Sequence, residues 1–296
     1  MKKYTMKNFN EQFPTEDACL DFLVKARWPK GVFCPKCQKV TKHYRIMGRK
    51  VYSCEFCGSH VSPTAATIFH KSDTPLRSWF HAIFLMASTR TGISAKQLQR
   101  ELGVTYKTAW RMFKEIRTLM AEGIAPMVGQ VEVDDTYIGG KHGGKPGRGA
   151  GGKTIAVGVV ERGGPATAKV IPDVKGNTLL PVILEHAPES EGTTIYTDEL
   201  TSYGAIDKAG YDHKTVNHGA GQYVLGAAHV NTVEALWSTI KRGIDGVNHS
   251  VRPRYLQSYL NSYFYRYNHR KDETPMFLSL LSRIPALASE AVVQPS

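Results

Sequence analysis

The stretch His229-Val-Asn-Thr-Val-Glu-Ala-Leu-Trp-Ser-Thr-Ile-Lys-Arg242 joins one carboxylate and two bases to an apolar segment with the period of a helix. At helical spacing, Glu234, Trp237 and Lys241 share one face, and an apolar stripe lies beside it. A single acid on such a face is most often a solvated surface charge. The charged face is therefore a candidate site only if other acids of the chain meet it.

Two acidic positions lie upstream, each in a run of β-branched and aromatic residues that is typical of a buried strand. The first run carries Asp134 and Asp135, and the second ends in Asp198. Side chains of a strand alternate between its faces, so Asp134 and Asp135 point to opposite sides, and Glu132 shares the side of Asp134. Residue types alone do not choose between the two neighbouring aspartates.

The order of elements after residue 130 indicates how these acids meet. Strands are expected at 131–138, 153–161, 166–171, 193–197 and 214–216, and helices at 179–185, 203–209 and 255–269. Three strands, a helix, a strand, a helix and a strand is the order of a ribonuclease-H-like fold. In that fold the first and fourth strands are neighbours, which predicts that Asp134 and Asp198 lie side by side and that a later helix supplies a third carboxylate.

Composition narrows the class of protein. The chain has 296 residues, which fits two or three domains, and its 42% hydrophobic and 22% charged residues are ordinary for a globular protein. A net charge of +12 and a pI near 9.4 indicate an anionic partner. Nucleic acid is favoured over a membrane surface because no amphipathic basic segment stands out. Without a run of about 18 apolar residues or a signal-like amino terminus, we expect a cytoplasmic protein with no membrane partner.

Four of the five cysteines form two C-x2-C pairs, Cys34 with Cys37 and Cys54 with Cys57, separated by 16 residues. This spacing presents four thiolates to one tetrahedral Zn²⁺ ion. A thioredoxin-like redox site would need only one such pair beside a βαβ pattern, which the sequence does not show. Basic and aromatic residues between the pairs favour a zinc ribbon that contacts nucleic acid. The alternative is a zinc site that only stabilises a small domain and binds no partner.

Residues 94–117 predict a helix, a turn at Gly103 and a second helix. In a helix-turn-helix the start of the second helix enters the major groove, which assigns Lys107 and Arg111 to DNA binding. Helical hairpins of this kind also occur in proteins that bind nothing. The positive charge and the adjacent cysteine module favour the DNA-binding interpretation.

The glycine-rich segment 139–152 carries Lys141, Lys145 and Arg148. Glycines permit close backbone approach to phosphate, but the Gly-Lys-Ser/Thr ending and following helix of a P-loop are missing. We interpret the segment as a basic loop that orders on DNA, with a plain flexible hairpin as the alternative.

The predicted domain boundaries lie at helix-breaking residues and where the pattern of residues changes from helical to strand-like. The predicted division is 1–70 for an amino-terminal helix and zinc ribbon, 71–124 for the helix-turn-helix region, 125–285 for the catalytic domain and 286–296 for a flexible tail. The expected fold class is a multidomain α+β or α/β protein in which a ribonuclease-H-like mixed sheet follows the zinc ribbon and the helix-turn-helix.

Taken together, these motifs resemble the bacterial insertion-sequence transposases of the DDE superfamily that carry an amino-terminal zinc ribbon, the ISXO2-like and Merlin-related family. The motifs are Cys34-Pro-Lys-Cys37, Cys54-Glu-Phe-Cys57, Val131-Glu-Val-Asp-Asp-Thr-Tyr-Ile-Gly-Gly-Lys141, Tyr196-Thr-Asp198 through Tyr203, His229-Val-Asn-Thr-Val-Glu234 and Tyr265-Arg-Tyr-Asn-His-Arg270. The resemblance covers nearly the whole chain. It implies an enzyme that binds the terminal inverted repeats of its element and cuts and rejoins DNA with Mg²⁺ or Mn²⁺.

The resemblance also implies roles for single residues. Asp134, Asp198 and Glu234 would be the metal ligands, followed by Lys241 and Arg242 near DNA phosphate.

This chain has Asp135 where the family pattern has Glu after the first aspartate. Some members use Asn as the third ligand, and Asn231 lies one turn before Glu234. Both residues therefore stay candidates for that role.

The expected partner is double-stranded DNA, both transposon ends and target, with a homodimer or larger assembly to join two ends. A zinc-ribbon and helix-turn-helix regulator with an inactive nuclease-like domain is the alternative. A nuclease of RNA–DNA hybrids is disfavoured, since a helix-turn-helix does not read A-form geometry.

Overall fold

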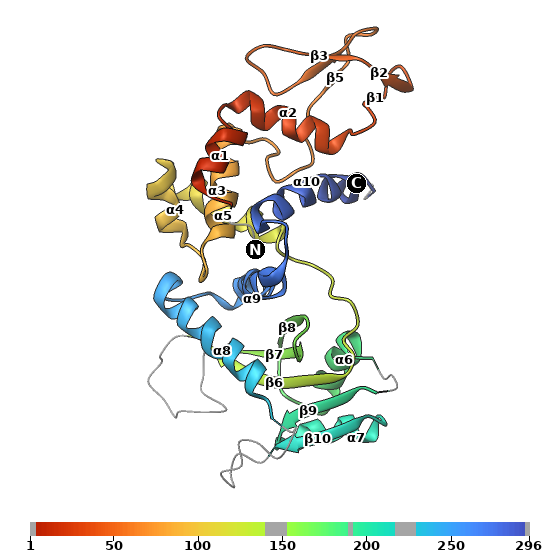
Figure 1. The fold of residues 1–296 in the computed structure, drawn as a ribbon, viewed down its shortest axis with the longest axis vertical. Coiled ribbons are helices and arrows are strands. Elements are labelled where there is room, and N and C mark those ends of the chain that lie inside the picture. Colours follow the sequence, from red (N-terminus) through yellow and green to blue (C-terminus); the bar gives the residue numbers. More distant parts are fainter. Residues whose placement is uncertain (1–3, 140–152, 189–191, 217–228, 294–296) are drawn as a thin grey trace. The chain divides into compact units, whose positions relative to one another are not determined.

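A computed structural model describes residues 4–139, 153–188, 192–216 and 229–293. The chain divides into two compact units (Figure 1). The first comprises Met1–Thr89, Ala95–Leu119 and Asp272–Ser296, and the second comprises Arg90–Ser94 and Met120–Lys271. Within the described ranges, no helix has the length and apolar character needed to cross a lipid bilayer.

The first unit opens with two helices, α1 (Met6–Gln12) and α2 (Glu16–Arg27). Five short strands follow: β1 (Val32–Cys34), β2 (Lys39–Thr41), β3 (His43–Arg45), β4 (Tyr52–Cys54) and β5 (His60–Val61). The first two pair with each other, and β4 pairs with both β3 and β5, all antiparallel. Cys34 and Cys54 end strands β1 and β4, and Cys37 and Cys57 lie in the turns that follow these strands.

Three further helices of this unit are α3 (Leu76–Ser88), α4 (Ala95–Leu102) and α5 (Tyr106–Thr118). Gly103 turns the chain between α4 and α5 with a φ of +63°, where glycine is free of strain. The Thr105 hydroxyl then accepts a hydrogen bond from the N–H of Thr108 at 3.2 Å and caps α5. The predicted sequence of helix, turn and helix is confirmed.

The carboxy-terminal residues differ from the predicted division at residue 285. Instead of a catalytic domain that ends there and a flexible tail, the helix α10 (Met276–Val293) runs across that position and belongs to the first unit. The reason is apolar packing: the ring centroid of Phe277 lies 5.8 Å from that of Phe9 and 5.9 Å from that of Phe13. The other predicted boundaries stay predictions, because the two compact units are coarser than the predicted domains.

The second unit is built on a five-stranded sheet in the order β10-β9-β6-β7-β8. Its strands are β6 (Gln130–Ile138), β7 (Thr154–Glu161), β8 (Ala166–Ile171), β9 (Thr194–Asp198) and β10 (Asp212–Val216). The first three form an antiparallel meander, while β9 runs parallel to β6 and β10 parallel to β9. Numbered along the chain this is the order 3-2-1-4-5, which confirms the predicted ribonuclease-H-like sheet.

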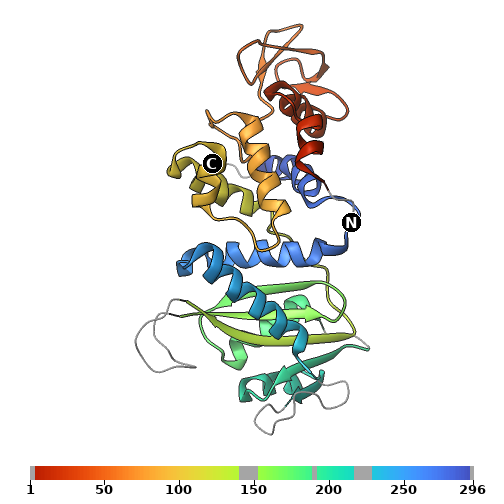
Figure 2. The same ribbon diagram turned by 60° about the vertical axis from the view of Figure 1, so that its left-hand side comes forward.

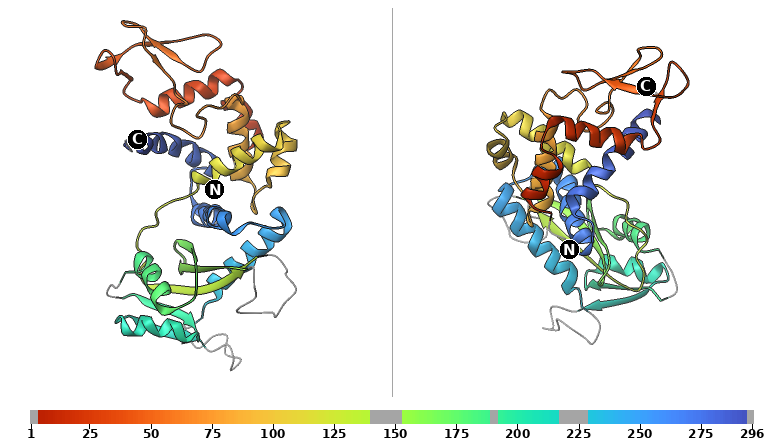
Figure 3. Two further views of the ribbon diagram at one scale, coloured as in Figure 1. Left: turned by 180° about the vertical axis from the view of Figure 1, so that it is seen from behind. Right: turned by 45° about the horizontal axis from the view of Figure 1, so that its top comes forward.

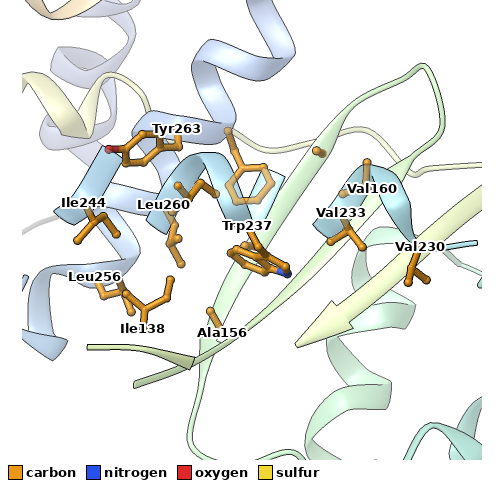
Figure 4. Close-up of a cluster of buried hydrophobic side chains, with 14 of the residues drawn as sticks. Ile138, Ala156, Val160, Val230, Val233, Trp237, Ile244, Leu256, Leu260 and Tyr263 are labelled. Atoms are coloured by element: carbon orange, nitrogen blue, oxygen red, sulfur yellow. The ribbon is translucent and has the colours of Figure 1, made fainter. Parts of the chain in front are cut away.

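Helices cover both faces of this sheet (Figures 2 and 3). One face carries α6 (Gly176–His186), η1 (Thr201–Tyr203) and α7 (Gly204–Lys208). The other carries α8 (Asn231–Gly243), the π-helical turn η3 (Ile244–Asn248) and α9 (Pro253–Asn268), and η4 (His269–Lys271) ends the unit. Each face thus has its own apolar core, and the one under α8 is drawn in Figure 4.

Candidate functional site

The pairing of β6 with β9 brings two aspartates to the same level of the sheet. Gln130 lies opposite Thr194 and Glu132 lies opposite Tyr196 in this parallel pair. The ladder ends at this pair, and Asp134 and Asp198 each lie two residues further along their strands. This register fits the predicted neighbourhood of the two aspartates.

Helix α8 packs closely on the sheet beside Asp134. Gly158 of β7 is the ladder partner of Asp134, and it lies directly under the helix. A Cβ atom on Gly158 would stand 2.8 Å from Cζ2 of Trp237 and 3.2 Å from Cγ2 of Val233. Both side chains are buried against the sheet (Figure 4). Only a glycine lets the helix lie this close, and the sequence signal for such a position is an isolated glycine inside an apolar strand.

The three predicted acids act on one another electrostatically. Burial, together with the negative charges of Asp135, Asp198 and Glu234, raises the pKa of Asp134 from its ordinary value of 3.8 to about 8. Asp134 and Asp198 are half-buried, and Glu234 is exposed on the first turns of α8. Strand β6, strand β9 and helix α8 thus bring three carboxylates near enough for Asp198 and Glu234 to influence the pKa of Asp134.

Strand alternation separates Asp134 from its neighbour Asp135. Asp135 is buried on the opposite face, where the hydroxyl of Tyr203 donates a hydrogen bond to its carboxylate at 3.4 Å. Tyr203 belongs to the core under α6 and α7, away from α8. The geometry therefore favours Asp134 as the first acid of the cluster.

The remaining candidates on α8 are all exposed. Asn231 is the first residue of the helix, and Lys241 and Arg242 lie in its last turn. Glu234 and Lys241 are seven residues apart, so they share one face of the helix, as the sequence predicted.

The carboxylate oxygens of Asp134, Asp198 and Glu234 do not all lie as close together as the ligand atoms of a single metal ion would. Among the described residues, the four cysteines are the one group of three or more His, Cys, Asp or Glu side chains whose ligand atoms all lie within 4.8 Å of one another. A pair of metal ions about 4 Å apart allows its outer ligands a larger separation.

A chain of three polar side chains begins at Thr197, the residue before Asp198 in β9. Thr197 Oγ1 lies 2.9 Å from Nε2 of His213, whose Nδ1 lies 3.0 Å from Oδ1 of Asp207. This order of groups resembles that of a nucleophile, a base and its orienting acid. Thr197 has no exposed surface, however, so its hydroxyl cannot reach a substrate and the set braces β9 against β10.

The cysteine cluster has the dimensions of a tetrahedral zinc site. The Sγ atoms of Cys34 and Cys57 are 3.5 Å apart and those of Cys37 and Cys54 are 3.8 Å apart, and none of them forms a disulfide. Zinc–sulfur bonds of about 2.3 Å imply sulfur separations of this size.

The two cysteine turns have the same local form. Gln38 and Gly58, each directly after the second cysteine of its pair, have φ of +54° and +67° and donate their N–H to the carbonyl of the first cysteine. Hydrogen bonding from Thr41 lowers the pKa of Cys54 to about 6, whereas the fifth cysteine, Cys19, lies outside the cluster and its pKa is raised to about 12 by burial. Within the cluster the pKa of Cys37 shifts the other way, raised to about 12 mainly by its hydrogen bond with Cys57.

The predicted DNA-binding residues fall into two groups. Lys107 and Arg111 are exposed on α5, and the Arg111 guanidinium donates to the carbonyl oxygen of His70 at 2.6 Å. The residues Lys141, Lys145 and Arg148 lie outside the described residues, so their prediction stays untested.

Comparison with known families decides the identity. A sequence profile of the ISXO2-like transposase domain matches residues 126–268, and a transposase zinc-ribbon profile matches residues 14–60. The chain contains an ISXO2-like transposase domain and a transposase zinc ribbon. The resemblance expected from the motifs is confirmed, and this insertion-sequence transposase carries a zinc-ribbon domain ahead of its catalytic domain.

Two curated proteins and a solved structure show what the chain is similar to. The transposase is 29% identical over 269 residues to an "uncharacterized protein in transposable element ISH50" of Halobacterium salinarum, covering 83% of this chain and 90% of the relative. It is 28% identical over 116 residues to an "uncharacterized transposase-like protein" of Haemophilus influenzae, covering 39% of this chain and 89% of the relative. Among solved structures, a Mos1 transposase paired-end complex aligns with a TM-score of 0.29 and 10% identity over 72% of this chain and 77% of that chain.

We expect Gly158→Ala to push α8 away from the sheet. The added methyl group would stand 2.8 Å from Trp237, and overpacking of this kind costs about 1–3 kcal/mol. Thermal unfolding should show a Tm lowered by about 2–4 °C for each kcal/mol, and transposition should fall with it. Gly204→Ala, at a helical position with open space around it, is the matched control. Equal Tm values for the two variants would contradict the close contact.

We expect Asp134→Asn to change the pH dependence of stability in metal-free buffer. A carboxyl with a pKa raised to about 8 stays protonated in the folded chain while the unfolded chain ionises near 3.8. The wild-type free energy of unfolding therefore falls as pH rises from about 4 to 8, and asparagine removes that loss. The Tm of the variant relative to wild type should accordingly increase between pH 5 and pH 8. A Tm difference that stays constant over this range would exclude the raised pKa.

Proposed function

We propose that this transposase cleaves DNA at the terminal inverted repeats of its element and joins the cut ends to target DNA, with divalent metal ions held by Asp134, Asp198 and Glu234. The observation that carries the proposal is the meeting of β6, β9 and α8 beside Asp134, whose pKa is raised by burial and further by the charges of Asp135, Asp198 and Glu234. Like charges gathered in this way are typical of a site that binds cations.

The donor set fits Mg²⁺ or Mn²⁺. All three candidate ligands offer carboxylate oxygens, which hard divalent cations prefer, and the proposed set contains no nitrogen or sulfur ligand. Bound there, two ions would activate a water molecule or a 3′ hydroxyl and stabilise the leaving oxygen. Asp134 must give up its proton to become a ligand, so metal affinity should rise with pH.

The basic end of α8 supports a DNA strand beside these acids. Lys241 and Arg242 are exposed on the same helix as Glu234, within the last turn. Ammonium and guanidinium groups bind phosphate oxygens with charge-assisted hydrogen bonds. We assign them to the DNA backbone next to the scissile phosphate.

The zinc ribbon supplies a second DNA contact in this proposal. Phe33, Val40 and Phe56 are 49%, 56% and 65% exposed, and Phe33 and Val40 are paired on adjacent strands. The Nζ atom of Lys39 lies 4.5 Å from the ring centroid of Phe56. Apolar groups interleaved with lysines suit the phosphates and base faces of DNA. Cys34, Cys37, Cys54 and Cys57 would hold the Zn²⁺ ion that shapes this surface.

Helix α5 fits the role of a recognition helix. Lys107 and Arg111 lie exposed in its first two turns, where a helix-turn-helix meets the major groove. Two transposon ends must be held together for their joining, so we infer a dimer or a larger assembly on DNA.

Replacement of a single carboxylate should abolish cleavage without abolishing DNA binding. We expect Asp198→Ala and Glu234→Gln each to lower the rate of end cleavage in Mg²⁺ by at least about 100-fold. Mutation of a residue that only hydrogen-bonds to a metal ligand already lowers metal affinity or activity by about 10- to 100-fold. Asn231→Ala and Glu199→Gln should retain cleavage. A gel-shift assay and a cleavage assay on a labelled inverted-repeat duplex measure the two activities.

Two outcomes would overturn the assignment of this site. Undiminished cleavage by Asp198→Ala would exclude the acid cluster as the catalytic centre. A wild-type chain that binds the duplex and leaves it intact in both Mg²⁺ and Mn²⁺ would favour a regulator with an inactive nuclease-like domain.

Zinc content should follow the cysteine cluster and control DNA affinity. We expect about one Zn²⁺ per purified chain, and its loss in Cys57→Ser together with a DNA affinity at least about 10-fold weaker. Cys19→Ser, a change at a buried cysteine outside the cluster, is the control and should retain the zinc. Mass spectrometry for metals and fluorescence anisotropy check the two quantities. Full zinc content in Cys57→Ser would contradict the four-cysteine site.

A further inference from the structure

Glu132 lies two residues before Asp134 on the same face of β6 and has no exposed surface. Its carboxylate accepts hydrogen bonds from the backbone N–H groups of Thr232 at 2.8 Å and Val233 at 3.0 Å, and from the Thr232 hydroxyl at 3.0 Å. Thr232 and Val233 are the second and third residues of α8, and the preceding Val230 gives no side-chain cap. A carboxylate from the sheet therefore satisfies N–H groups that the start of this helix would leave unpaired, and it complements the helix dipole.

Arg162 holds the same carboxylate from the other side. Its Nε donates to Oε1 of Glu132 at 2.7 Å, and its terminal nitrogens donate to the side-chain oxygen of Gln130 at 3.0 Å and to the carbonyl oxygen of His229 at 2.6 Å. The guanidinium also lies 4.1 Å from the ring centroid of Tyr196 on β9. One arginine thus connects β6, β9 and the residues that lead into α8.

These contacts leave Glu132 no free capacity to bind a metal ion. Two carboxylate oxygens offer about four lone-pair sites, and four donors occupy them: two backbone N–H groups, one hydroxyl and one guanidinium N–H. The Nδ1 atom of His229 lies a further 3.2 Å from Oε1 of the same carboxylate. Glu132 is buried beside the acid cluster, yet its hydrogen bonds are directed to the protein.

We propose that Glu132 is a positioning residue for the catalytic centre: by capping α8 it fixes the helix turn that carries Glu234 next to Asp134. Glu234 follows Val233 directly, so any displacement of the capped turn moves the third carboxylate. The inference rests on the proposed metal-dependent function, because its importance lies in where Glu234 is held.

The test uses the full-length, zinc-loaded chain and the variants Glu132→Ala and Glu132→Gln. The first readout is hydrogen exchange of the backbone amides of residues 230–240 without added metal, and the second is titration with Mn²⁺ alone. In Glu132→Ala we expect exchange in the first turn of α8 to rise at least about 10-fold and Mn²⁺ affinity to fall about 10- to 100-fold. Glutamine keeps an acceptor for the N–H groups but loses the charge that pairs with Arg162, so its effects should be intermediate.

Glu161→Gln is the matched control, since it removes a carboxylate from the neighbouring strand whose hydrogen bond goes to the N–H of Val128. It should change neither readout. Unaltered exchange in both Glu132 variants would overturn the cap, and faster exchange with unaltered Mn²⁺ affinity would overturn the positioning role. A third outcome would identify Glu132 as a metal ligand instead. In that case Glu132→Gln would weaken Mn²⁺ binding as much as Glu132→Ala does, while hydrogen exchange in the first turn of α8 stays as slow as in the wild type. If the wild-type chain binds no Mn²⁺, the proposed function fails, and the exchange measurement still decides whether Glu132 caps α8.

Discussion

Carboxylates that share one site repel one another, and the fold of the second unit must hold them against that repulsion. The pKa of Asp134 is raised by burial and then further by this repulsion from the neighbouring carboxylates. The opposing forces are the hydrogen bonds of the parallel β6–β9 pair and the burial of Val233 and Trp237 of α8 on the sheet at Gly158. The buried apolar cluster under α8, which includes Val233 and Trp237, thus supports the helix that carries Glu234.

The sequence predicted much of this arrangement because local patterns carry it. The C-x2-C spacing, the alternation of strand residues and the helical period of residues 229–242 each report a short-range geometry. The order of the elements then predicted the sheet, and family profiles and strand order confirm both the family and the fold. The prediction of Asp134 beside Asp198 depended only on strands one and four being neighbours.

The features that local patterns missed depend on distant contacts. Alternation separates Asp134 from Asp135, but only the position of α8 tells which face forms the site. Glu132 is an ordinary strand residue in sequence until Thr232 and Arg162 are seen to meet it. Helix α10 joined the first unit through Phe277, although its sequence position follows the catalytic domain.

The two clusters of this chain differ in how far apart their members lie in sequence. The four cysteines come from residues 34–57, whereas the hydrogen bond of Glu132 with Thr232 joins residues 100 positions apart. Chain closure over longer distances costs more entropy and slows folding, and domains fold from the amino terminus as synthesis proceeds. A ribosome-bound chain therefore completes its cysteine module well before Thr232 and the turn of α8 that carries Glu234 have been synthesised.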